Sequence, residues 1–273
     1  MYLNRSNFKR TQFTWIYSLL IFSVSTISVA AECSAKSGAQ STPLLELYTS
    51  EGCSSCPSAD KWMSSIAGSG FTSDKVVPLA FHVDYWDYIG WKDRFGKAEY
   101  SNRQRQAAKH DFAAFVYTPQ VTLNGTDFRG WQQGSRFSQA LETSSRQPAK
   151  ANLRINITSG ETNSSSVSVA AQTIKPEDAK NLDAYIAVYE NNLKSEVKAG
   201  ENAGRQLKHD YVVRELYGPY RLEEKIADKQ AGGWQRSLPL NAEWKNRDIG
   251  VAAFLQNRES GQVVQALSLK ACL

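Results

Sequence analysis

The sequence predicts an α/β domain followed by an all-β, sandwich-like domain, and three observations support this prediction. The chain has 273 residues, which is enough for two domains of ordinary size. Apolar residues make up 41% and charged residues 22% of the chain, which is typical of a globular protein rather than a disordered one. Strand-like and helix-like segments alternate in the first half, whereas short alternating apolar patterns fill the second half.

The elements of the α/β domain are predicted between residues 41 and 148. Apolar segments of strand length alternate there with segments of helical character. Asn124 and Gly125 favour a tight hairpin, because both residue types tolerate positive φ. The predicted order is β-α-β-α-β-β-α, over residues 44–49, 53–67, 76–84, 97–115, 120–124, 127–130 and 135–145.

The second domain is predicted over residues 149–273. Apolar side chains alternate with polar ones there, as expected of strands with one buried face. Several such strands, separated by turn-like segments, favour a β-sandwich. The apolar faces are formed by Leu153, Ile155 and Ile157, by Val167, Val169 and Ala171, and by Ala184, Ile186 and Val188, and further strands are expected at 211–216, 249–255 and 263–271.

Residues 1–31 have the layout of a secretory signal peptide. Arg5, Lys9 and Arg10 precede an apolar run that ends in the small residues Ala30 and Ala31. An uncleaved membrane anchor is the alternative, because the run approaches the length that spans a bilayer. We expect cleavage, and therefore a periplasmic or secreted protein with no membrane attachment.

Removal of this segment leaves a nearly neutral protein. The whole chain carries a formal charge of +5, and three of its positive residues lie in the segment, which leaves +2. Proteins that bind nucleic acid usually present a basic patch or stripe. The sequence shows none, so we expect no nucleic-acid partner, and no motif indicates a cofactor.

The chain has four cysteines, and the expected export decides how they are interpreted. Disulfides form and persist outside the cytoplasm. Cys53 and Cys56 form a CxxC motif, whereas Cys33 and Cys272 lie at the two ends of the exported chain. We predict a disulfide between Cys33 and Cys272, because the alternative leaves two free thiols in an oxidising compartment.

The CxxC motif follows a predicted strand and begins a predicted helix. The N–H groups and dipole at a helix N-terminus stabilise an anion and lower the pKa of a thiol there. We therefore predict a redox-active pair, with Cys53 as the more exposed, attacking thiol and Cys56 as the resolving thiol. The alternatives are an inert structural disulfide and half of a zinc site. Zinc would need a second pair at comparable spacing, which the chain lacks, so we expect no metal site.

Aromatic residues follow the second predicted strand. In open α/β sheets ligands bind outside the carboxyl ends of the strands, and the CxxC motif leaves the first strand at that edge. We therefore interpret Tyr85, Trp86, Asp87 and Trp91 as a candidate substrate-binding wall. The alternative is that these aromatic side chains only cap the fold.

Three ionisable residues are candidates for proton transfer. Glu46 lies among leucines on the first predicted strand, and His82 and Asp84 lie on the second. A buried carboxylate beside a CxxC pair can accept the proton of the resolving thiol, and histidine titrates near neutral pH. The alternatives are a Glu46 that faces solvent and a His82 that only fills the core.

A CxxC between strand and helix, with Thr118 and Pro119 before a hairpin, resembles the thioredoxin fold. The resemblance implies that Pro119 is cis and faces the cysteines, and that Thr118 binds substrate peptide through its backbone. The chain also resembles an uncharacterised family of secreted bacterial proteins, the domain of unknown function 1223, in the segments 48–57, 81–87, 90–93, 117–120, 200–205 and 212–214. The fold class implied is an α/β thioredoxin-like domain followed by an all-β sandwich-like C-terminal domain.

The predicted function is an extracytoplasmic thiol–disulfide oxidoreductase that acts on protein thiols or disulfides together with an unidentified redox partner. One alternative is a non-catalytic binding module in which the CxxC disulfide is structural. Another is a copper-handling protein that uses Cys53, Cys56 and His82, since soft thiolates suit Cu(I). The direction of exchange depends on a reduction potential that the sequence does not reveal.

Overall fold

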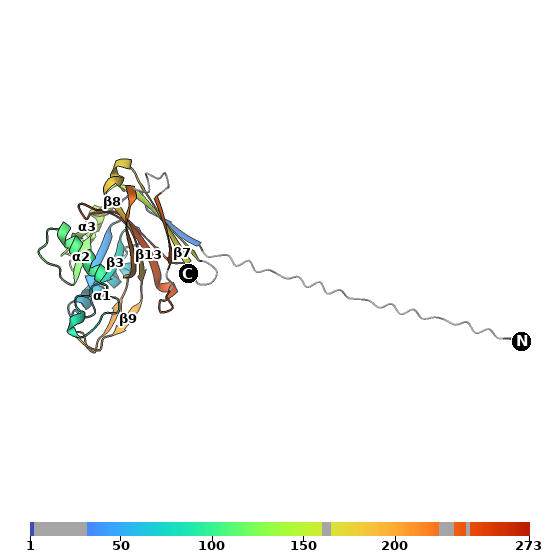
Figure 1. Cartoon of the computed structure of the whole chain (residues 1–273), viewed down its shortest axis with the longest axis horizontal. Helices are drawn as coiled ribbons and strands as arrows, with labels where there is room; N and C mark the ends of the chain where they lie inside the picture. The colour runs from blue at the N-terminus through green and yellow to red at the C-terminus, as the bar shows by residue number, and fades with distance from the viewer. Residues whose placement is uncertain (3–31, 160–164, 224–231, 239–240) are drawn as a thin grey trace.

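The computed structural model of the chain describes residues 1–2, 32–159, 165–223, 232–238 and 241–273 (Figure 1). The signal peptide predicted at residues 1–31 falls almost wholly outside the described residues. The α-helices are α1 (Cys56–Ser65), α2 (Ala98–His110) and α3 (Gly134–Ser145), and the 3₁₀ helices are η1 (Ala67–Ser69), η2 (Asp87–Ile89), η3 (Pro176–Asn181) and η4 (Asn246–Asp248). The strands are β1 (Glu32–Lys36), β2 (Leu44–Thr49), β3 (Val77–His82), β4 (Gln120–Leu123), β5 (Thr126–Asp127), β6 (Ala151–Ser159), β7 (Ser165–Thr173), β8 (Leu182–Glu190), β9 (Leu193–Glu196), β10 (Gln206–His209), β11 (Val212–Arg221), β12 (Gly232–Leu238), β13 (Ile249–Asn257) and β14 (Val263–Lys270).

An eight-stranded sheet forms the centre of the described structure, in the order β14-β13-β8-β11-β3-β2-β4-β5. β3 pairs in parallel with β2 and with β11, and the other neighbours in this sheet are antiparallel. A second, antiparallel sheet has the order β1-β6-β7-β12, and β9 and β10 form a separate antiparallel pair. Figure 1 shows α1, α2 and α3 grouped on the side of the molecule away from β7.

The predicted fold class, an α/β thioredoxin-like domain followed by an all-β sandwich-like domain, is wrong. Strands make up 41% and helices 23% of the residues that the structure describes, so this part of the chain is mostly β-sheet and its main sheet is large. The physical reason is that β11, from the second half of the chain, pairs with the edge of β3, so that strands from both halves form one sheet. Local periodicity indicates strands but not their partners. The predicted division between residues 148 and 149 lies between α3 and β6 and stays a prediction.

Both faces of the central sheet are covered. Side chains along a strand point alternately to opposite faces, so β2 serves both. On one face its leucines pack against α1 and α3, in a cluster that includes Leu45, Leu47, Ala59, Met63, Phe137 and Leu141. On the other face Tyr48 stacks on Phe81, which packs edge-on against Tyr100 of α2. The four-stranded sheet shares a third cluster with β8 and β13.

Glu46 lies in β2 on the face toward α2 and forms a buried ion pair with Arg103. The Arg103 Nε donates to Glu46 Oε1 at 2.7 Å, and the Thr122 hydroxyl donates to Glu46 Oε2 at 3.1 Å. Burial alone would lower the pKa of Arg103, but the charge of Glu46 raises it overall. The Glu46 carboxylate is therefore occupied by Arg103. It does not face the CxxC helix, because α1, which begins at Cys56, covers the opposite face of the sheet.

A disulfide joins Cys33 in β1 to Cys272 after β14, with 6.1 Å between the Cα atoms. This is the pairing predicted from the sequence. The bond ties the outer strand of the four-stranded sheet to the last strand of the central sheet. It closes a loop with a sequence separation of 239 residues.

Replacing both of these cysteines (Cys33→Ser with Cys272→Ser) should lower the free energy of unfolding by up to about 5 kcal/mol, the chain-entropy value for a loop of this length. Urea unfolding followed by circular dichroism measures it. The control, Cys53→Ser with Cys56→Ser, opens a loop with a sequence separation of only 3, for which the same model gives about 2 kcal/mol. Equal losses in the two double variants would contradict the expectation.

Glu46→Leu should destabilise the protein by about 3–5 kcal/mol, because it leaves the Arg103 guanidinium buried without its partner. The double variant Glu46→Leu with Arg103→Met removes both charges and should recover much of that loss. Urea unfolding again gives the free energies. If the double variant is no more stable than the single one, the ion pair does not explain the effect of Glu46.

Candidate functional site

Cys53 and Cys56 form a disulfide at the N-terminus of α1, with 5.4 Å between their Cα atoms. Pro57 lies in the first turn of α1, where its missing N–H costs little. Ser54 and Ser55, between the cysteines, are exposed. The side chains of both cysteines are buried, with 1% of Cys53 and none of Cys56 exposed. The disulfide is therefore enclosed, and the assignment of Cys53 as the more exposed, attacking thiol stays a prediction.

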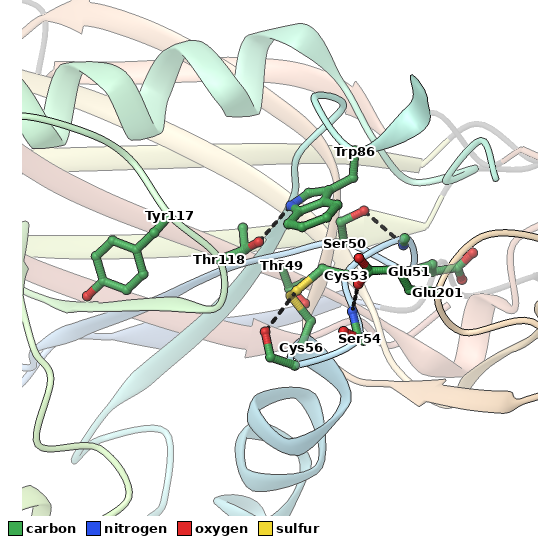
Figure 2. Close-up of a disulfide and its surroundings, with 12 residues drawn as sticks. Thr49, Ser50, Glu51, Cys53, Ser54, Cys56, Trp86, Tyr117, Thr118 and Glu201 are labelled. Atoms are coloured by element: carbon green, nitrogen blue, oxygen red, sulfur yellow. Dashed lines mark hydrogen bonds between the residues drawn. A yellow bond between two sulfur atoms is a disulfide. The ribbon is translucent and has the colours of Figure 1, made fainter. Parts of the chain in front are cut away.

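Trp86 and Thr118 lie on one side of the disulfide (Figure 2). Trp86 packs so closely on Gly52 that a Cβ at position 52 would lie 3.1 Å from the Trp86 Cβ, so the residue before Cys53 has little room for a side chain. The Trp86 Nε1 donates a hydrogen bond to the Thr118 Oγ1 at 2.7 Å. The Thr118–Pro119 peptide bond is cis, as the resemblance implied. Trp86 thus connects the CxxC motif to the segment around Pro119.

The turn between β9 and β10 holds the backbone of the motif from another side. The Asn202 Nδ2, which is fully buried, donates to the backbone oxygens of Glu51 and Cys53 at 2.8 and 2.9 Å. The Glu201 Oε2 accepts a hydrogen bond from the Ser54 N–H at 2.9 Å, which lowers the pKa of Glu201 (Figure 2). Sequence reasoning gave these two residues no role, because they lie about 150 positions from the motif and no local pattern links them to it.

Five buried acids and histidines, each at most 5% exposed, adjoin the motif: Glu51, Asp60, His82, Asp93 and His209. The His82 Nδ1 lies 2.6 Å from the Asp93 Oδ2. The His209 Nε2 lies 3.3 Å from the Glu51 Oε1, and its Nδ1 lies 3.6 Å from the Asp60 Oδ1. The two imidazole rings pack edge-on with 4.9 Å between their centres. We refer to these five residues as the acid–histidine cluster.

The charges of the acid–histidine cluster shift its pKa values. Burial alone would lower the pKa of His209, but Asp60 and Glu51 raise it to about 10. Burial alone would raise the pKa of Asp93, but the interaction with His82 lowers it overall. Burial alone would raise the pKa of Glu51, but its interactions with His209, Ser195 and Trp91 together lower it. The cluster therefore favours the ionised forms of Glu51 and Asp93 and the protonated form of His209.

The predicted substrate wall makes contacts inside the protein. Tyr85, Trp86, Asp87 and Trp91 are all partly buried. Their hydrogen-bond partners are Gln104 for the Tyr85 hydroxyl (3.0 Å), Thr118 for Trp86, the Asp93 N–H for the Asp87 carboxylate (3.1 Å) and Glu51 for the Trp91 Nε1 (2.8 Å). Trp86 and Trp91 thus connect the loop to the motif, and substrate binding by this loop stays a prediction.

The three predicted proton-transfer residues lie in three different environments. His82 belongs to the acid–histidine cluster. Asp84 accepts a hydrogen bond from the hydroxyl of Ser101 on α2. Glu46 is paired with Arg103 on the face of the sheet away from α1. Of the three, His82 is the one that the structure brings together with the residues flanking the cysteines.

Known proteins resemble this chain over most of its length. Residues 44–256 match the family described as Protein of unknown function (DUF1223). No protein with a curated description matches the chain. In the part of the chain that the structure describes, none of the helices has the length and apolar character needed to cross a membrane.

Two solved structures are similar in fold. One is an X-ray structure of a protein from Agrobacterium tumefaciens, with a TM-score of 0.58 and 24% identity over 85% of this chain and 96% of that one. The other is HBP35 of Porphyromonas gingivalis, with a TM-score of 0.61 and 15% identity over 86% of this chain and 76% of that one. Both identities are low, so these likenesses show the fold alone.

Asn202→Ala should speed the reduction of the Cys53–Cys56 disulfide by dithiothreitol about 10-fold or more. The substitution removes two buried hydrogen bonds, of about 1 kcal/mol each, that hold the β9–β10 turn against the backbone of the motif. Quenching with a maleimide of high mass and counting thiols on a gel gives the rate. Asn156→Ala is the matched control, since that amide lies on β6 and bonds to Ser168. Equal rates for the two variants would show that Asn202 does not restrict access.

Proposed function

The chain belongs to the family described as Protein of unknown function (DUF1223), and from the geometry of its disulfide we propose that it is a thiol–disulfide oxidoreductase acting on protein substrates. The observation that carries the proposal is the Cys53–Cys56 disulfide at a helix N-terminus, with Trp86 bonded to Thr118 beside it. The signal-peptide layout of residues 1–31 supports a periplasmic or secreted location, where such pairs exchange with protein disulfides.

Exchange through this pair proceeds in two steps. A thiolate of the substrate attacks the Sγ of Cys53, the bond to Cys56 breaks, and Cys56 leaves as a thiolate. The N–H groups and dipole of α1 favour a thiolate at this position. A second substrate thiolate then attacks the substrate sulfur of the mixed disulfide and releases Cys53 as a thiolate. The substrate has lost two electrons and gained a disulfide, and a redox partner with a disulfide of its own takes the electrons from the protein. The reverse sequence reduces a substrate disulfide.

Access to the buried disulfide requires movement of Trp86 and of the β9–β10 turn with Asn202, which we call the cover. The hydrogen bonds of Asn202 and the packing of Trp86 on Gly52 are the contacts that have to open. Tyr117, which precedes Thr118, lines a shallow hollow with Phe115, Arg129 and Trp131, and two thirds of the Phe115 side chain is exposed. A hollow with aromatic walls suits an apolar side chain of a substrate peptide that approaches along Thr118.

A second candidate function is a non-catalytic binding module in which the disulfide is structural. The burial of both cysteines favours it, because inert structural cysteines are buried whereas reactive ones are partly accessible. For the copper alternative, Cys53 and Cys56 are bonded to each other and the His82 Nδ1 is held by Asp93, so among the described residues no hydrogen bond between His82 and a cysteine supports it.

Equilibration of the protein in glutathione buffers of graded potential separates the two candidates. An oxidoreductase should show a reversible two-electron transition of Cys53 and Cys56 while the fold is intact, and it should exchange with a small peptide disulfide. Cys53→Ser should abolish both, and Cys33→Ser with Cys272→Ser should retain both. A disulfide that resists reduction until the protein unfolds, and that exchanges with no peptide, would establish the structural role instead.

A further inference from the structure

Several buried polar atoms of the acid–histidine cluster have no hydrogen-bond partner. They are the Glu51 Oε1, the His82 Nε2 and both ring nitrogens of His209, and all three residues are at most 1% exposed. Buried polar groups of folded proteins are nearly always paired, so a set of unpaired ones in one place requires an explanation. Among the described residues, no Lys or Arg forms an ion pair with the carboxylates of this cluster.

The His209 Nδ1 and the Asp60 Oδ1 are too far apart for a good hydrogen bond. A hydrogen bond between nitrogen and oxygen spans about 2.7–3.2 Å, whereas the His209 Nδ1 and the Asp60 Oδ1 are 3.6 Å apart. Ligands around a tetrahedral zinc ion, each about 2.1 Å from the metal, lie about 3.4 Å from one another. Asp60, His82 and His209 each offer one ligand atom within 4.8 Å of the others, a spacing from which small side-chain movements would form such a site.

In each of the three residues, one polar atom contacts a neighbouring side chain, which directs the other polar atom toward a common point. The His82 Nδ1 is held by Asp93, which leaves the Nε2 free. The His209 Nε2 faces Glu51, so its Nδ1 is the nitrogen directed at Asp60. Metal-bound histidines nearly always contact a carboxylate or carbonyl through their other nitrogen, which fixes the tautomer and the ring orientation. Both histidines of the cluster have this arrangement.

The third ligand is oriented in the same way. The Thr49 hydroxyl donates to the Asp60 Oδ2 at 3.1 Å, so the Oδ1 is the oxygen left to face His209. Asp60 belongs to α1, His82 ends β3 and His209 ends β10. β10 packs against α1, and Figure 1 shows its partner β9 at that end of the molecule. Three separate elements thus bring one ligand each to the same buried place.

We propose that Asp60, His82 and His209 bind a divalent first-row transition-metal ion, with Glu51 and Asp93 as the carboxylates that orient the histidines. Imidazole with carboxylate suits zinc, iron(II) and their neighbours, whereas calcium and magnesium prefer ligand sets made of oxygen alone. Three protein ligands leave one coordination position of a tetrahedral ion for water or another small ligand. No metal site was expected from the sequence, because no local pattern links Asp60 and His82 to His209, which lies in the second half of the chain.

The electrostatics of the cluster agree with this assignment. Three carboxylates surround two imidazoles, and among the described residues no Lys or Arg forms an ion pair with them. The resulting negative potential attracts a divalent cation. Because His209 and Asp60 lie on β10 and α1, the ion would also tie the β9–β10 pair to the helix that begins with Cys56.

Zinc binding to the purified full chain, stripped of metal with a chelator, tests the proposal. Competition with a chromophoric chelator should give one zinc per chain, and Co²⁺ should produce the visible absorption bands of a tetrahedral site. The chain has three histidines, so His110→Gln is the matched control for His82→Gln and His209→Gln. The control should bind as the unchanged protein does, whereas His82→Gln, His209→Gln and Asp60→Asn should each bind more than about 100-fold more weakly, since even the loss of a carboxylate that orients a metal-bound histidine costs about 10–100-fold.

Circular dichroism checks that each variant folds. If a ligand variant does not fold, Glu51→Gln tests the site in its place. This variant should fold and should bind zinc about 10–100-fold more weakly, because Glu51 orients His209. Cys53→Ser with Cys56→Ser should retain zinc binding, so this test does not depend on the proposed thiol exchange. The proposal is overturned by the absence of stoichiometric binding, by equal affinities of His209→Gln and His110→Gln, or by binding that is lost in the cysteine variant and kept in His209→Gln.

Discussion

The parallel pairing of β11 with β3 decides which residues of this protein meet. Val212 lies opposite Ala80, and the Ala80 N–H donates to the backbone oxygen of Tyr211 at 2.8 Å. His82 is two residues beyond Ala80, and His209 is two residues before Tyr211. The pairing therefore fixes both ends of the His82–His209 contact and brings the β9–β10 turn to the cysteines. Without it the CxxC helix would lack its covering turn and the contact of Asp60 with His209.

The sequence predicted the elements that depend on local patterns. β2 occupies the predicted residues 44–49, and α3 begins one residue before its predicted start. α2 ends at His110, short of the predicted 115, and Phe112 beyond it has a φ of 53°, which a helix does not allow. The fold class could not be predicted in the same way, because no local pattern encodes that a strand from the second half pairs with β3. Asn202 and His209 were missed for that reason.

The environment of the cysteines combines two opposing effects. Burial disfavours a charged thiolate and keeps reactants away, whereas a helix N-terminus favours a thiolate. The cover contacts mainly the backbone of the motif. Trp86 packs on Gly52, and Asn202 donates to the backbone oxygens of Glu51 and Cys53. A cover of this kind can move without disturbing the cysteine side chains, so burial in the closed state does not conflict with exchange in an open one.

Glu51 connects the cysteines to the acid–histidine cluster. Its backbone N–H donates to Asp93 at 2.9 Å, and its backbone oxygen accepts from Asn202. Its carboxylate accepts from Trp91 and faces His209. A metal ion on His209 and Asp60 would rely on this same carboxylate to orient His209. A change in the cluster would therefore affect Glu51, two residues before Cys53, without any contact with sulfur. Glu51 therefore links the segment before Cys53 to the acid–histidine cluster, through its backbone on one side and its carboxylate on the other.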